Sequence, residues 1–363
     1  MLYVIITDFC EMNLVNSTKH ILVTGGAGYI GSHAVRALSQ AGFRVTILDN
    51  LVYGHERIAK DVLRVPLIQG QVGDANLVSM ILRGMHPGSC FGPVDAVIHF
   101  AAYAYVGESM RDPARYYRNN LADSLTLLEL LVSEGLRRTG SPLPIVFSST
   151  CATYGIPDFA GMPIEESCPQ VPINPYGRSK WMIEQVIYDF YKAYGMPSVI
   201  LRYFNAAGAD PSADLGEDHT PETHLIPLTL KAISGLSPHL EIYGADYPTR
   251  DGTCVRDYVH VADLASAHVL GLYKLLENGG LYSYNLGNCH GYSVLEVIEV
   301  AQQVTGGKVR IKVGGRRDGD PPVLVASSRK AFDELGWRPM YAKLSTMIEH
   351  AWIWHQKIYS ASG

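Results

Sequence analysis

The chain has 363 residues, of which 47% are hydrophobic and 18% are charged, and its net charge is −5 at pH 7. Because domains usually contain about 100–200 residues, this length predicts two domains with sizeable cores. The acidic balance and the lack of a Lys or Arg run exclude nucleic acid as an expected partner. No stretch approaches the ~18 apolar residues of a membrane span, so no membrane partner is expected.

The six cysteines lie far apart and form no CxxC pair or other metal-ligand spacing. We therefore expect no metal site, and we expect reduced thiols, because a chain of this length does not need disulfides. The apolar run Leu2–Ile6 lacks the basic region and cleavage site of a signal peptide. These features predict a cytoplasmic protein. Residues 1–18 precede the first predicted strand and are expected to form an N-terminal extension that can be disordered.

Short β-branched runs alternate with helical patterns along the N-terminal half. A helix is predicted over Ser32–Ala41, and strands are predicted over His20–Thr24, Arg44–Leu48, Val65–Val72, Ala96–Phe100, Pro144–Ser149 and Ser198–Phe204. Nearly continuous apolar runs such as Asp95–Phe100 are typical of parallel strands that are covered on both faces. The alternation predicts an α/β fold with a Rossmann-like, doubly wound parallel sheet.

The pattern is less regular beyond residue 200. The stretch Ala209–Glu222 is polar and contains proline, and loops of that length are usually functional or disordered. Short strands are predicted near Leu240–Tyr243, Tyr284–Leu286 and Val309–Val313, between helices. We expect a Rossmann domain over residues 19–200 and a smaller α+β domain over 201–363, with some segments returning to the first sheet.

A glycine-rich loop follows the first predicted strand, where Gly25, Gly26, Gly28 and Gly31 satisfy both GxGxxG and GxxGxxG. Such glycines let a pyrophosphate approach the backbone, and the next helix offers free N–H groups and its positive end. Asp49 ends the second strand, where an acid binds the adenosine ribose diol and repels a 2′-phosphate. The pattern predicts NAD rather than NADP, although each part alone also suits an ordinary turn.

Tyr176 and Lys180 form the second pattern, since residues four apart share one face of a helix. A free tyrosine has a pKa near ~10 and is a poor base. A lysine ammonium one turn away, together with the positive nicotinamide ring, would favour the phenolate. The tyrosine can then exchange a hydroxyl proton while hydride moves. Ser148, Ser149 and Thr150 end a strand upstream, where a hydroxyl can bind the reacting oxygen. An exposed helix pair and a polar strand end are the alternatives.

Together these segments resemble the extended short-chain dehydrogenase/reductase family and, within it, the UDP-glucose (UDP-galactose) 4-epimerases. The resemblance runs from about Lys19 to Gln356. It is carried by TGGAGYIGSH from Thr24, LDNL from Leu48, FAAYAYVGES from Phe100, FSSTCATYG from Phe147, YGRSK from Tyr176, LRYFNAAGA from Leu201, HLIP from His224, DGTCVRDYVHV from Asp251 and RRDGDPP from Arg316. It implies tightly bound NAD, a UDP-sugar substrate held mainly by the C-terminal domain, and a homodimer.

The resemblance implies a role for each matching residue. Tyr176 would be the acid/base, Lys180 its partner, and Thr150 the hydroxyl that shares the sugar O4. Contacts to NAD are expected from Tyr176, Lys180, Gly25, Gly28, Tyr29, Ile30, Gly31, Asp49, Asn50, Gln71, Val72, Phe100, Ala101, Ala102, Asn119, Ser148 and Tyr203. Contacts to the UDP-sugar are expected from Thr150, Tyr176, Asn205, His224, Leu225, Tyr243, Arg256, Arg317, Asp320 and Leu324. The arginine fork suits a diphosphate, although surface ion pairs are the alternative for Arg256 and Arg317.

Four positions depart from the family's frequent pattern: Thr150 stands for Ser, Gln71 for Asp, Ala104 for Lys and His224 for Asn. Thr150 and Gln71 keep a hydrogen-bonding group, whereas Ala104 loses a contact to the cofactor. His224 would make UDP-sugar affinity depend on pH between about pH 5.5 and 8.

Other functions remain open on this scaffold. Related dehydratases carry an acidic pair after the Ser/Thr strand end, and related decarboxylases carry a Glu, but Cys151 and Ala152 occupy these positions here. A non-enzymatic NAD sensor would lack the Tyr/Lys pair. Leu324 is expected to line the sugar pocket, where an aromatic residue excludes N-acetyl groups. UDP-glucose and UDP-galactose are the expected substrates, with UDP-N-acetylhexosamines or UDP-pentoses such as UDP-xylose and UDP-arabinose as alternatives.

Overall fold

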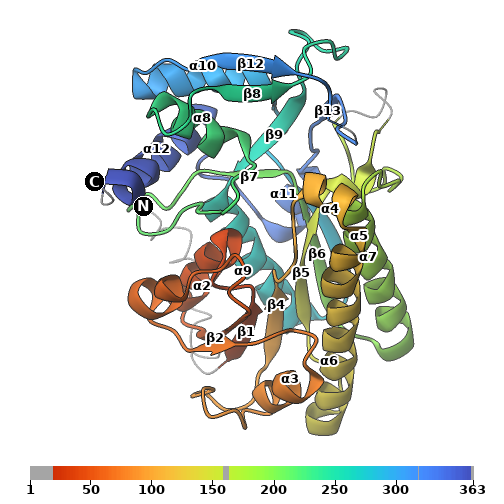
Figure 1. Ribbon diagram of the computed structural model, residues 1–363. Helices are drawn as coiled ribbons and strands as arrows, with labels where there is room; N and C mark the ends of the chain where they lie inside the picture. The colour runs from red at the N-terminus through yellow and green to blue at the C-terminus, as the bar shows by residue number, and fades with distance from the viewer. Residues whose placement is uncertain (1–18, 158–162, 318, 361–363) are drawn as a thin grey trace.

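The computed structural model describes residues 19–157, 163–317 and 319–360, so the predicted extension over 1–18 lies outside the described residues. A parallel sheet of seven strands forms the centre (Figure 1). In spatial order its strands are β10 (Leu281–Leu286), β6 (Ser198–Tyr203), β5 (Ile145–Thr150), β4 (Ala96–His99), β1 (His20–Thr24), β2 (Arg44–Asp49) and β3 (Leu67–Gln69). The sheet confirms the predicted Rossmann-like α/β class.

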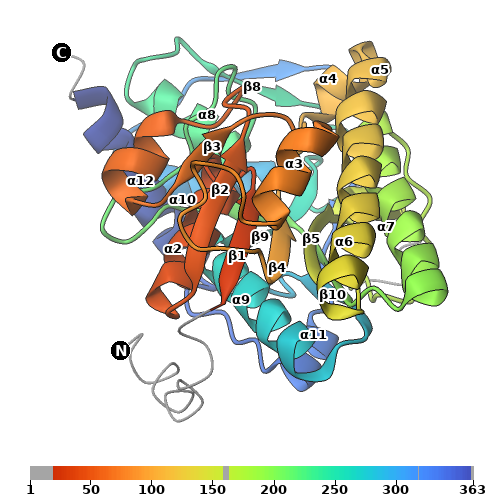
Figure 2. The ribbon, with the colours of Figure 1, turned by 90° about the horizontal axis from the view of Figure 1, so that it is seen from below.

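Helices cover both faces of this sheet (Figures 1 and 2). One face carries α2 (Tyr29–Gln40), α9 (Val261–Asn278) and α11 (Arg329–Leu335). The other carries α3 (Ala75–Leu82), α6 (Ser124–Thr139) and α7 (Pro175–Tyr194). Because both faces are buried, every residue of β1, β4 and β5 is buried, as their apolar runs predict.

Several predicted boundaries shift in the structure. The first helix begins at Tyr29 rather than Ser32, because the glycine-rich turn passes directly into it. The predicted strand Val65–Val72 pairs only over Leu67–Gln69, since it is an edge strand of the sheet. Tyr284–Leu286 is part of β10 and pairs with β6 in the large sheet.

Apart from α9, β10 and α11, the helices and strands beyond residue 204 build a second layer, at the top of Figure 1. Around β9 (Val255–His260) pair β7 (Asn205–Ala207), β11 (Gly291–Ser293) and β13 (Val323–Leu324), and β8 (Leu240–Tyr243) pairs with β12 (Ile311–Gly314). The helices of this layer are α8 (Leu225–Ile233), α10 (Val294–Thr305) and α12 (Leu344–Ser360). The short helices elsewhere are η3 (Ile58–Leu63), α4 (Val106–Arg111), α5 (Pro113–Tyr116), η4 (Tyr117–Asp123) and η5 (Cys151–Tyr154).

The two layers meet at the carboxyl ends of the parallel strands. Strand order reverses beside β1, with β2 and β3 on one side and β4, β5 and β6 on the other. Ligands of open parallel sheets bind in the crevice at such a switch point. Thr150 and Tyr203 end β5 and β6 in register, so their side chains reach the same edge. The fold therefore places the predicted strand-end residues together.

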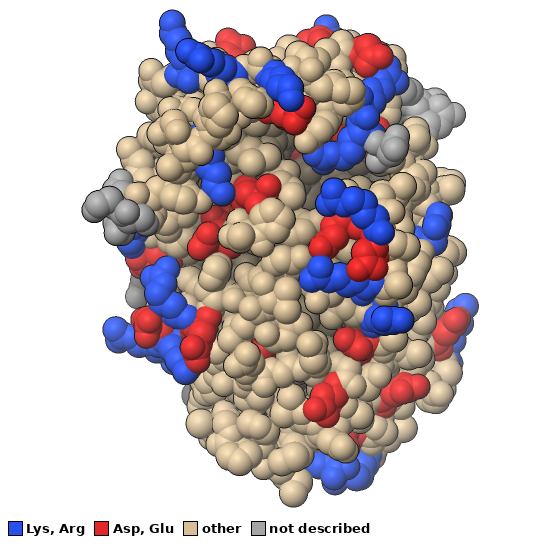
Figure 3. Space-filling view, viewed as in Figure 1, with Lys and Arg blue, Asp and Glu red and all other residues tan. Residues whose placement is uncertain are grey.

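The surface carries charges of both signs, as the small net charge of the chain predicts. Lys and Arg side chains are interspersed with Asp and Glu on the face shown in Figure 3. Among the described residues, no helix is long and apolar enough to cross a membrane.

Candidate functional site

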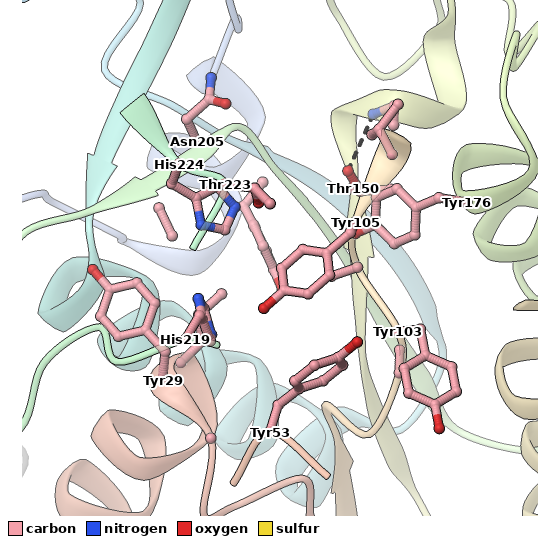
Figure 4. A pocket seen from close by; sticks show the side chains of 18 of the residues that line it. Tyr29, Tyr53, Tyr103, Tyr105, Thr150, Tyr176, Asn205, His219, Thr223 and His224 are labelled. Atoms are coloured by element: carbon pink, nitrogen blue, oxygen red, sulfur yellow. Dashed lines mark hydrogen bonds between the residues drawn. The ribbon is translucent and has the colours of Figure 1, made fainter. Parts of the chain in front are cut away.

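One cavity of about 480 Å³ lies between the two layers, and every predicted site residue lines it. In Figure 4, Thr150 and Tyr176 lie at one side of this cavity and Asn205, His219 and His224 at the other. We call the side formed by the glycine-rich loop and the large sheet the cofactor wall. The opposite side, formed by the second layer and the loop before α8, is the substrate wall.

The glycine-rich loop of the cofactor wall has no room for side chains at two positions. Gly25 has a φ of +72°, and a Cβ there would lie 2.6 Å from the backbone N of Ala101. A Cβ on Gly31 would lie 2.2 Å from the carbonyl oxygen of Gly25. This packing holds the start of α2 against the loop. Since Gly28 precedes α2 without a side-chain cap, the first N–H groups of the helix stay available for an anion.

Asp49 and its neighbours extend the cofactor wall at the ends of β2 and β3. The Asp49 carboxylate accepts hydrogen bonds from the N–H groups of Ala27 (3.0 Å) and Leu51 (2.9 Å). It therefore braces the glycine-rich loop, and the residue also lines the cavity. Asn50 donates to Gln71 across a distance of 3.1 Å. Backbone N–H groups, small residues and an acid suit a dinucleotide, so the residues present fit NAD.

The helix α7 brings Tyr176 to the cavity. The Asn174 side chain caps its first turn by accepting from Gly177 N–H at 2.8 Å, and Pro175 occupies the first helical position. A Cβ on Gly177 would lie 2.4 Å from the Ala152 carbonyl oxygen, so glycine allows α7 to approach η5 closely. The buried Glu184 of α7 pairs with Arg202 of β6 at 2.7 Å, which fixes the helix to the sheet.

Lys180 lies one turn after Tyr176 and is 4% exposed. Its ammonium donates to the carbonyl oxygen of Ser148 at 2.8 Å and lies 4.9 Å from the centre of the Phe147 ring. Burial lowers the pKa of Lys180 to about 7, although Glu184 opposes this shift. The Ser148 hydroxyl in turn contacts the Tyr203 hydroxyl at 2.6 Å. Lys180, Ser148 and Tyr203 thus form a polar group at the sheet edge.

The burial of Tyr176 opposes ionisation of its hydroxyl. Burial, together with Tyr203, raises the pKa of Tyr176 well above its ordinary value, and the hydrogen bond with Thr150 only partly offsets this. The protein's own groups therefore keep Tyr176 protonated, and Lys180 does not by itself produce a phenolate. The positive charge expected from a bound nicotinamide ring is the missing contribution.

Thr150 lies beside Tyr176 at the end of β5. Its hydroxyl accepts from the Ala152 N–H at 3.1 Å and also hydrogen-bonds the Tyr176 side chain. Cys151 and Ala152 line the cavity next to it. Burial raises the pKa of Cys151 to about 12, so its thiol stays neutral. No carboxylic acid stands at the two positions that elimination would use.

The substrate wall presents two arginines. Arg256 on β9 pairs with Asp320, and the Arg256 side chain is only 12% exposed. Arg317 lies with its guanidinium 4.4 Å from the centre of the Tyr243 ring. Asn205 donates to the Asp257 carbonyl oxygen at 2.9 Å. Both arginines line the cavity, and the ion pair of Arg256 with Asp320 lies in the cavity wall rather than on the open surface. Arg316 makes the exposed kind of ion pair, with Asp246.

Three further predicted residues lie on the same wall. Leu324 on β13 is 5% exposed and packs beside Cys151 and Phe204. Leu225 begins α8, with His224 at the position before it. Although burial opposes it, the carboxylates of Glu217 and Glu222 raise the pKa of His224 to about 10. The imidazole therefore stays charged through the range in which we expected it to titrate, and that expectation is wrong for the protein alone.

Sequence reasoning missed two groups of cavity residues. Tyr53, Tyr103 and Tyr105 stack edge to face beside the cofactor wall, with ring centres 5.8 and 5.1 Å apart. Alternating tyrosines in FAAYAYVGES were the available signal. Glu217 and His219 line the cavity on the loop before α8. Their signal was a Glu-x-His pair that recurs five residues later.

Comparison with known proteins agrees with this geometry. Residues 21–287 match the NAD dependent epimerase/dehydratase family. The UDP-glucose 4-epimerase of Halalkalibacterium halodurans is 48% identical over 337 residues, which cover 93% of this chain and 96% of that protein. The crystal structure of UDP-glucose 4-epimerase from Brucella ovis in complex with NAD superposes with a TM-score of 0.83 at 43% identity, covering 92% of this chain and 98% of that one.

A second solved structure holds both kinds of ligand. It is the UDP-glucose 4-epimerase from Bifidobacterium longum in complex with NAD⁺ and UDP, with a TM-score of 0.83, 36% identity, and coverage of 93% of this chain and 98% of that chain. The family match and these relatives span the glycine-rich loop, the Tyr/Lys pair and the substrate wall. The chain belongs to the NAD dependent epimerase/dehydratase family.

Proposed function

We propose that this protein is an NAD-dependent UDP-sugar 4-epimerase that interconverts UDP-glucose and UDP-galactose. The proposal rests on the position of Tyr176, Lys180 and Thr150 in one cavity. They lie there between the glycine-rich loop of the cofactor wall and the two arginines of the substrate wall. The absence of an acid at Cys151 and Ala152 favours epimerisation over dehydration. The relatives named above support the same reaction.

The residues at the sheet edge have separate tasks in this reaction. Tyr176 takes the proton from the sugar O4 and later returns it, and Thr150 shares the hydrogen bond to that oxygen. Lys180, held by the Ser148 carbonyl, places a positive charge close to the forming phenolate when its amine is protonated. When bound, NAD supplies the acceptor and donor of the hydride at C4. Because Tyr176 returns the proton that it took, the same residue serves both halves of the reaction and ends in its starting protonation state.

The substrate wall would hold the UDP portion while the sugar turns over. Arg256 and Arg317 provide paired N–H donors for the diphosphate, and Asp320 can accept from a ribose hydroxyl. Leu225 opens the N-terminal turn of α8, where backbone N–H groups favour an anion. Binding energy at these remote groups restrains an intermediate that must rotate between the two halves of the reaction.

The division of labour and the assembly belong to this proposal as well. Residues 19–200 would mainly hold NAD, and residues 201–363 would mainly hold the UDP-sugar. We further propose a cytoplasmic homodimer, as the resemblance of the motifs implies. Light scattering of the purified chain is expected to give twice the mass of one chain, and the mass of a single chain would contradict the dimer.

The direct test is to incubate the protein with each UDP-sugar without added NAD and to separate the products. UDP-glucose is expected to give UDP-galactose, and UDP-galactose the reverse, because the NAD is regenerated in every cycle. Product from UDP-N-acetylglucosamine or UDP-xylose alone would move the proposal to one of those substrates. A 4-keto-6-deoxy sugar would instead indicate a dehydratase.

Replacing Tyr176 tests the chemistry itself. Tyr176→Phe removes only the hydroxyl, so turnover is expected to fall at least about 10²–10⁴-fold while NAD stays bound. Turnover is measured on UDP-galactose, and bound NAD is measured after the protein is denatured. Tyr188→Phe, on the same helix and outside the cavity, is the matched control and should keep full activity. A non-enzymatic NAD sensor would show no UDP-sugar turnover even before the substitution.

A further inference from the structure

Four titratable side chains converge on the loop between β7 and α8, at the substrate wall. They are Glu217, His219, Glu222 and His224, and one ligand atom from each lies within 4.8 Å of all the others. Within the described ranges, this is the one group of three or more His, Cys, Asp or Glu residues so arranged. Both imidazoles lie at the same side of the pocket in Figure 4, with ring centres 5.7 Å apart.

The spacing of the ligand atoms matches a small metal ion. Nδ1 of His219 is 3.2 Å from Oε1 of Glu217, and Nδ1 of His224 is 3.4 Å from Oε1 of Glu222. Nitrogen and oxygen ligands lie about 2.0–2.2 Å from a tetrahedral Zn²⁺, which separates them by roughly 3.3–3.5 Å. The side chains therefore stand near ligand positions already. The closer contact between Glu217 and His224 would have to widen, and the remaining pairs of ligand atoms all lie within 4.8 Å.

Two of these atoms are buried and contact one another within the cluster. Oε1 of Glu217 and Nδ1 of His219 have no hydrogen-bond partner of acceptable geometry, but they form an ion pair at 3.2 Å, and Oε1 of Glu217 also contacts His224. The Glu217 side chain is only 7% exposed. Buried polar atoms without a partner are rare, and each calls for an explanation such as an ion. Each lies within 4.8 Å of a ligand atom from every other residue of the cluster, as ligation of one ion requires.

Neighbouring groups hold the cluster in place. Oε1 of Glu222 accepts from the backbone N–H groups of Thr223 and His224, at 2.7 and 2.8 Å. The indole N–H of Trp354 on α12 donates to the Glu217 carbonyl oxygen at 2.9 Å. The Tyr29 ring, at the start of α2, lies 6.3 Å from the His219 ring. Such outer contacts orient the ligands of protein metal sites.

We propose that Glu217, His219, Glu222 and His224 bind one divalent transition-metal ion, with Zn²⁺ as the preferred metal. Two imidazoles and two carboxylates offer nitrogen and oxygen ligands without a thiolate, a set that suits Zn²⁺. Because all four ligands come from the protein, the site is structural. It ties the loop to the first turn of α8 and sets the substrate wall against Tyr29 of the cofactor wall.

This inference does not rest on the proposed function, since metal binding requires no turnover. It does assign a different task to His224, which would hold the ion and position Leu225 rather than contact the diphosphate itself. The competing interpretation is an ionic network in which a proton on His224 takes the place of the metal. Direct measurement of bound metal separates the two.

The first experiment uses the full chain, produced without a metal-affinity tag. The protein is stripped with EDTA, incubated with ZnCl₂, passed through gel filtration and analysed for zinc by mass spectrometry. We expect one zinc ion per chain, and a melting temperature that rises by roughly 3–5 °C when free zinc is near a hundred times its Kd. Zinc content near zero after gel filtration would overturn the proposal.

Variants then locate the ion. Glu217→Gln and His219→Ala should each weaken zinc binding at least about 10-fold. The matched controls are Asp218→Asn in the same loop and His55→Ala, because these side chains contact each other at 3.4 Å outside the cluster. Both controls should keep one zinc per chain. Equal zinc in all four variants would place the ion elsewhere and refute this site.

A second metal tests the site in the unaltered chain, so this result does not depend on whether a variant folds. Co²⁺ bound to the unaltered chain should show the visible absorption of a four-coordinate ion without a thiolate charge-transfer band. A thiolate band would assign the metal to a cysteine and overturn the proposal. Circular dichroism and NAD content, measured on the same samples, show whether each variant is folded. A protein that binds zinc but turns over no UDP-sugar would leave this inference standing and remove the proposed function.

Discussion

The two walls of the cavity are built in opposite ways. The cofactor wall is made of backbone and small residues at the carboxyl ends of β1, β4 and β5, and Gly25 and Gly31 are necessary because no Cβ fits. The substrate wall is made of long charged side chains from loops and short strands, such as Arg256 paired with Asp320. Shape therefore defines the cofactor wall, and paired charges define the substrate wall.

The proposed catalytic residues stand between the walls and share properties of both. Tyr176 and Lys180 are fixed by the sheet and buried like the cofactor wall, yet they are titratable like the residues of the substrate wall. Burial therefore disfavours the charged form of both side chains. A cationic ligand on the cofactor wall would favour the Tyr176 phenolate, while it would disfavour the Lys180 ammonium further.

The shape of the cofactor wall is tested most strongly at Gly31. In Gly31→Ala the new methyl group would lie 2.2 Å from the Gly25 carbonyl oxygen and 2.9 Å from Cα of Gly26. Neither backbone atom can move without opening the loop, so NAD affinity should fall at least about 100-fold, or some 2.7 kcal/mol. NAD retained after gel filtration measures this. Gly107→Ala, where nothing lies within 4 Å, is the control and should retain NAD fully.

The charges of the substrate wall are tested at Arg256. Arg256→Lys keeps the charge but loses the planar fork, so the KM for UDP-sugar should rise about 10–100-fold while NAD content stays unchanged. Steady-state kinetics with UDP-galactose measure the change. Arg316→Lys is the matched control, because Arg316 pairs with Asp246 outside the cavity and is half-exposed. Loss of NAD in Arg256→Lys would show that the walls are not independent.

The residue between the walls is tested through pH. Lys180 has a pKa of about 7 in the folded chain and near ~10.4 when unfolded. The unfolded state therefore binds more protons between these values, so Lys180 makes the free energy of unfolding increase with pH by at most about 1.4 kcal/mol per unit. Urea unfolding of NAD-free protein at several pH values should show a steeper rise in the wild type than in Lys180→Met. Parallel curves would contradict the lowered pKa.

The same contrast explains what could be predicted from the sequence. The strand His20–Thr24 and the glycines after it are local signals, and the fold confirmed the predicted sheet. The sequence did not predict that β7, β11 and β13 pair around β9, because these strands are short and lie far apart along the chain. Motif residues such as Thr150 and Tyr176 meet in the cavity because parallel strands bring their carboxyl ends to one edge.

The contacts within the charged loop before α8 could be predicted least from the sequence. We expected no metal site because no cysteine spacing indicated one, and the two Glu-x-His pairs gave only a weak signal. Their convergence depends on the chain folding back onto Tyr29 and onto Trp354 of α12, which lie far away in the sequence. Burial opposes the raised pKa of His224, which comes from Glu217 and Glu222 of the same loop. How the charged side chains of one loop pair with each other is therefore the part that local patterns leave undetermined.

The smallest expected effect concerns the sugar end of the substrate wall, at Leu324. Leu324 packs beside Tyr154 and Phe204 in a closed cluster, so a larger side chain there must extend into the cavity. In Leu324→Tyr, kcat/KM for UDP-glucose should stay within about 3-fold, whereas any activity on UDP-N-acetylglucosamine should fall at least about 10-fold, because steric exclusion acts on the bulkier group. Leu324→Ala should shift the ratio of the two kcat/KM values the other way. An equal loss on both substrates in Leu324→Tyr would mean that the residue supports packing and does not select the sugar.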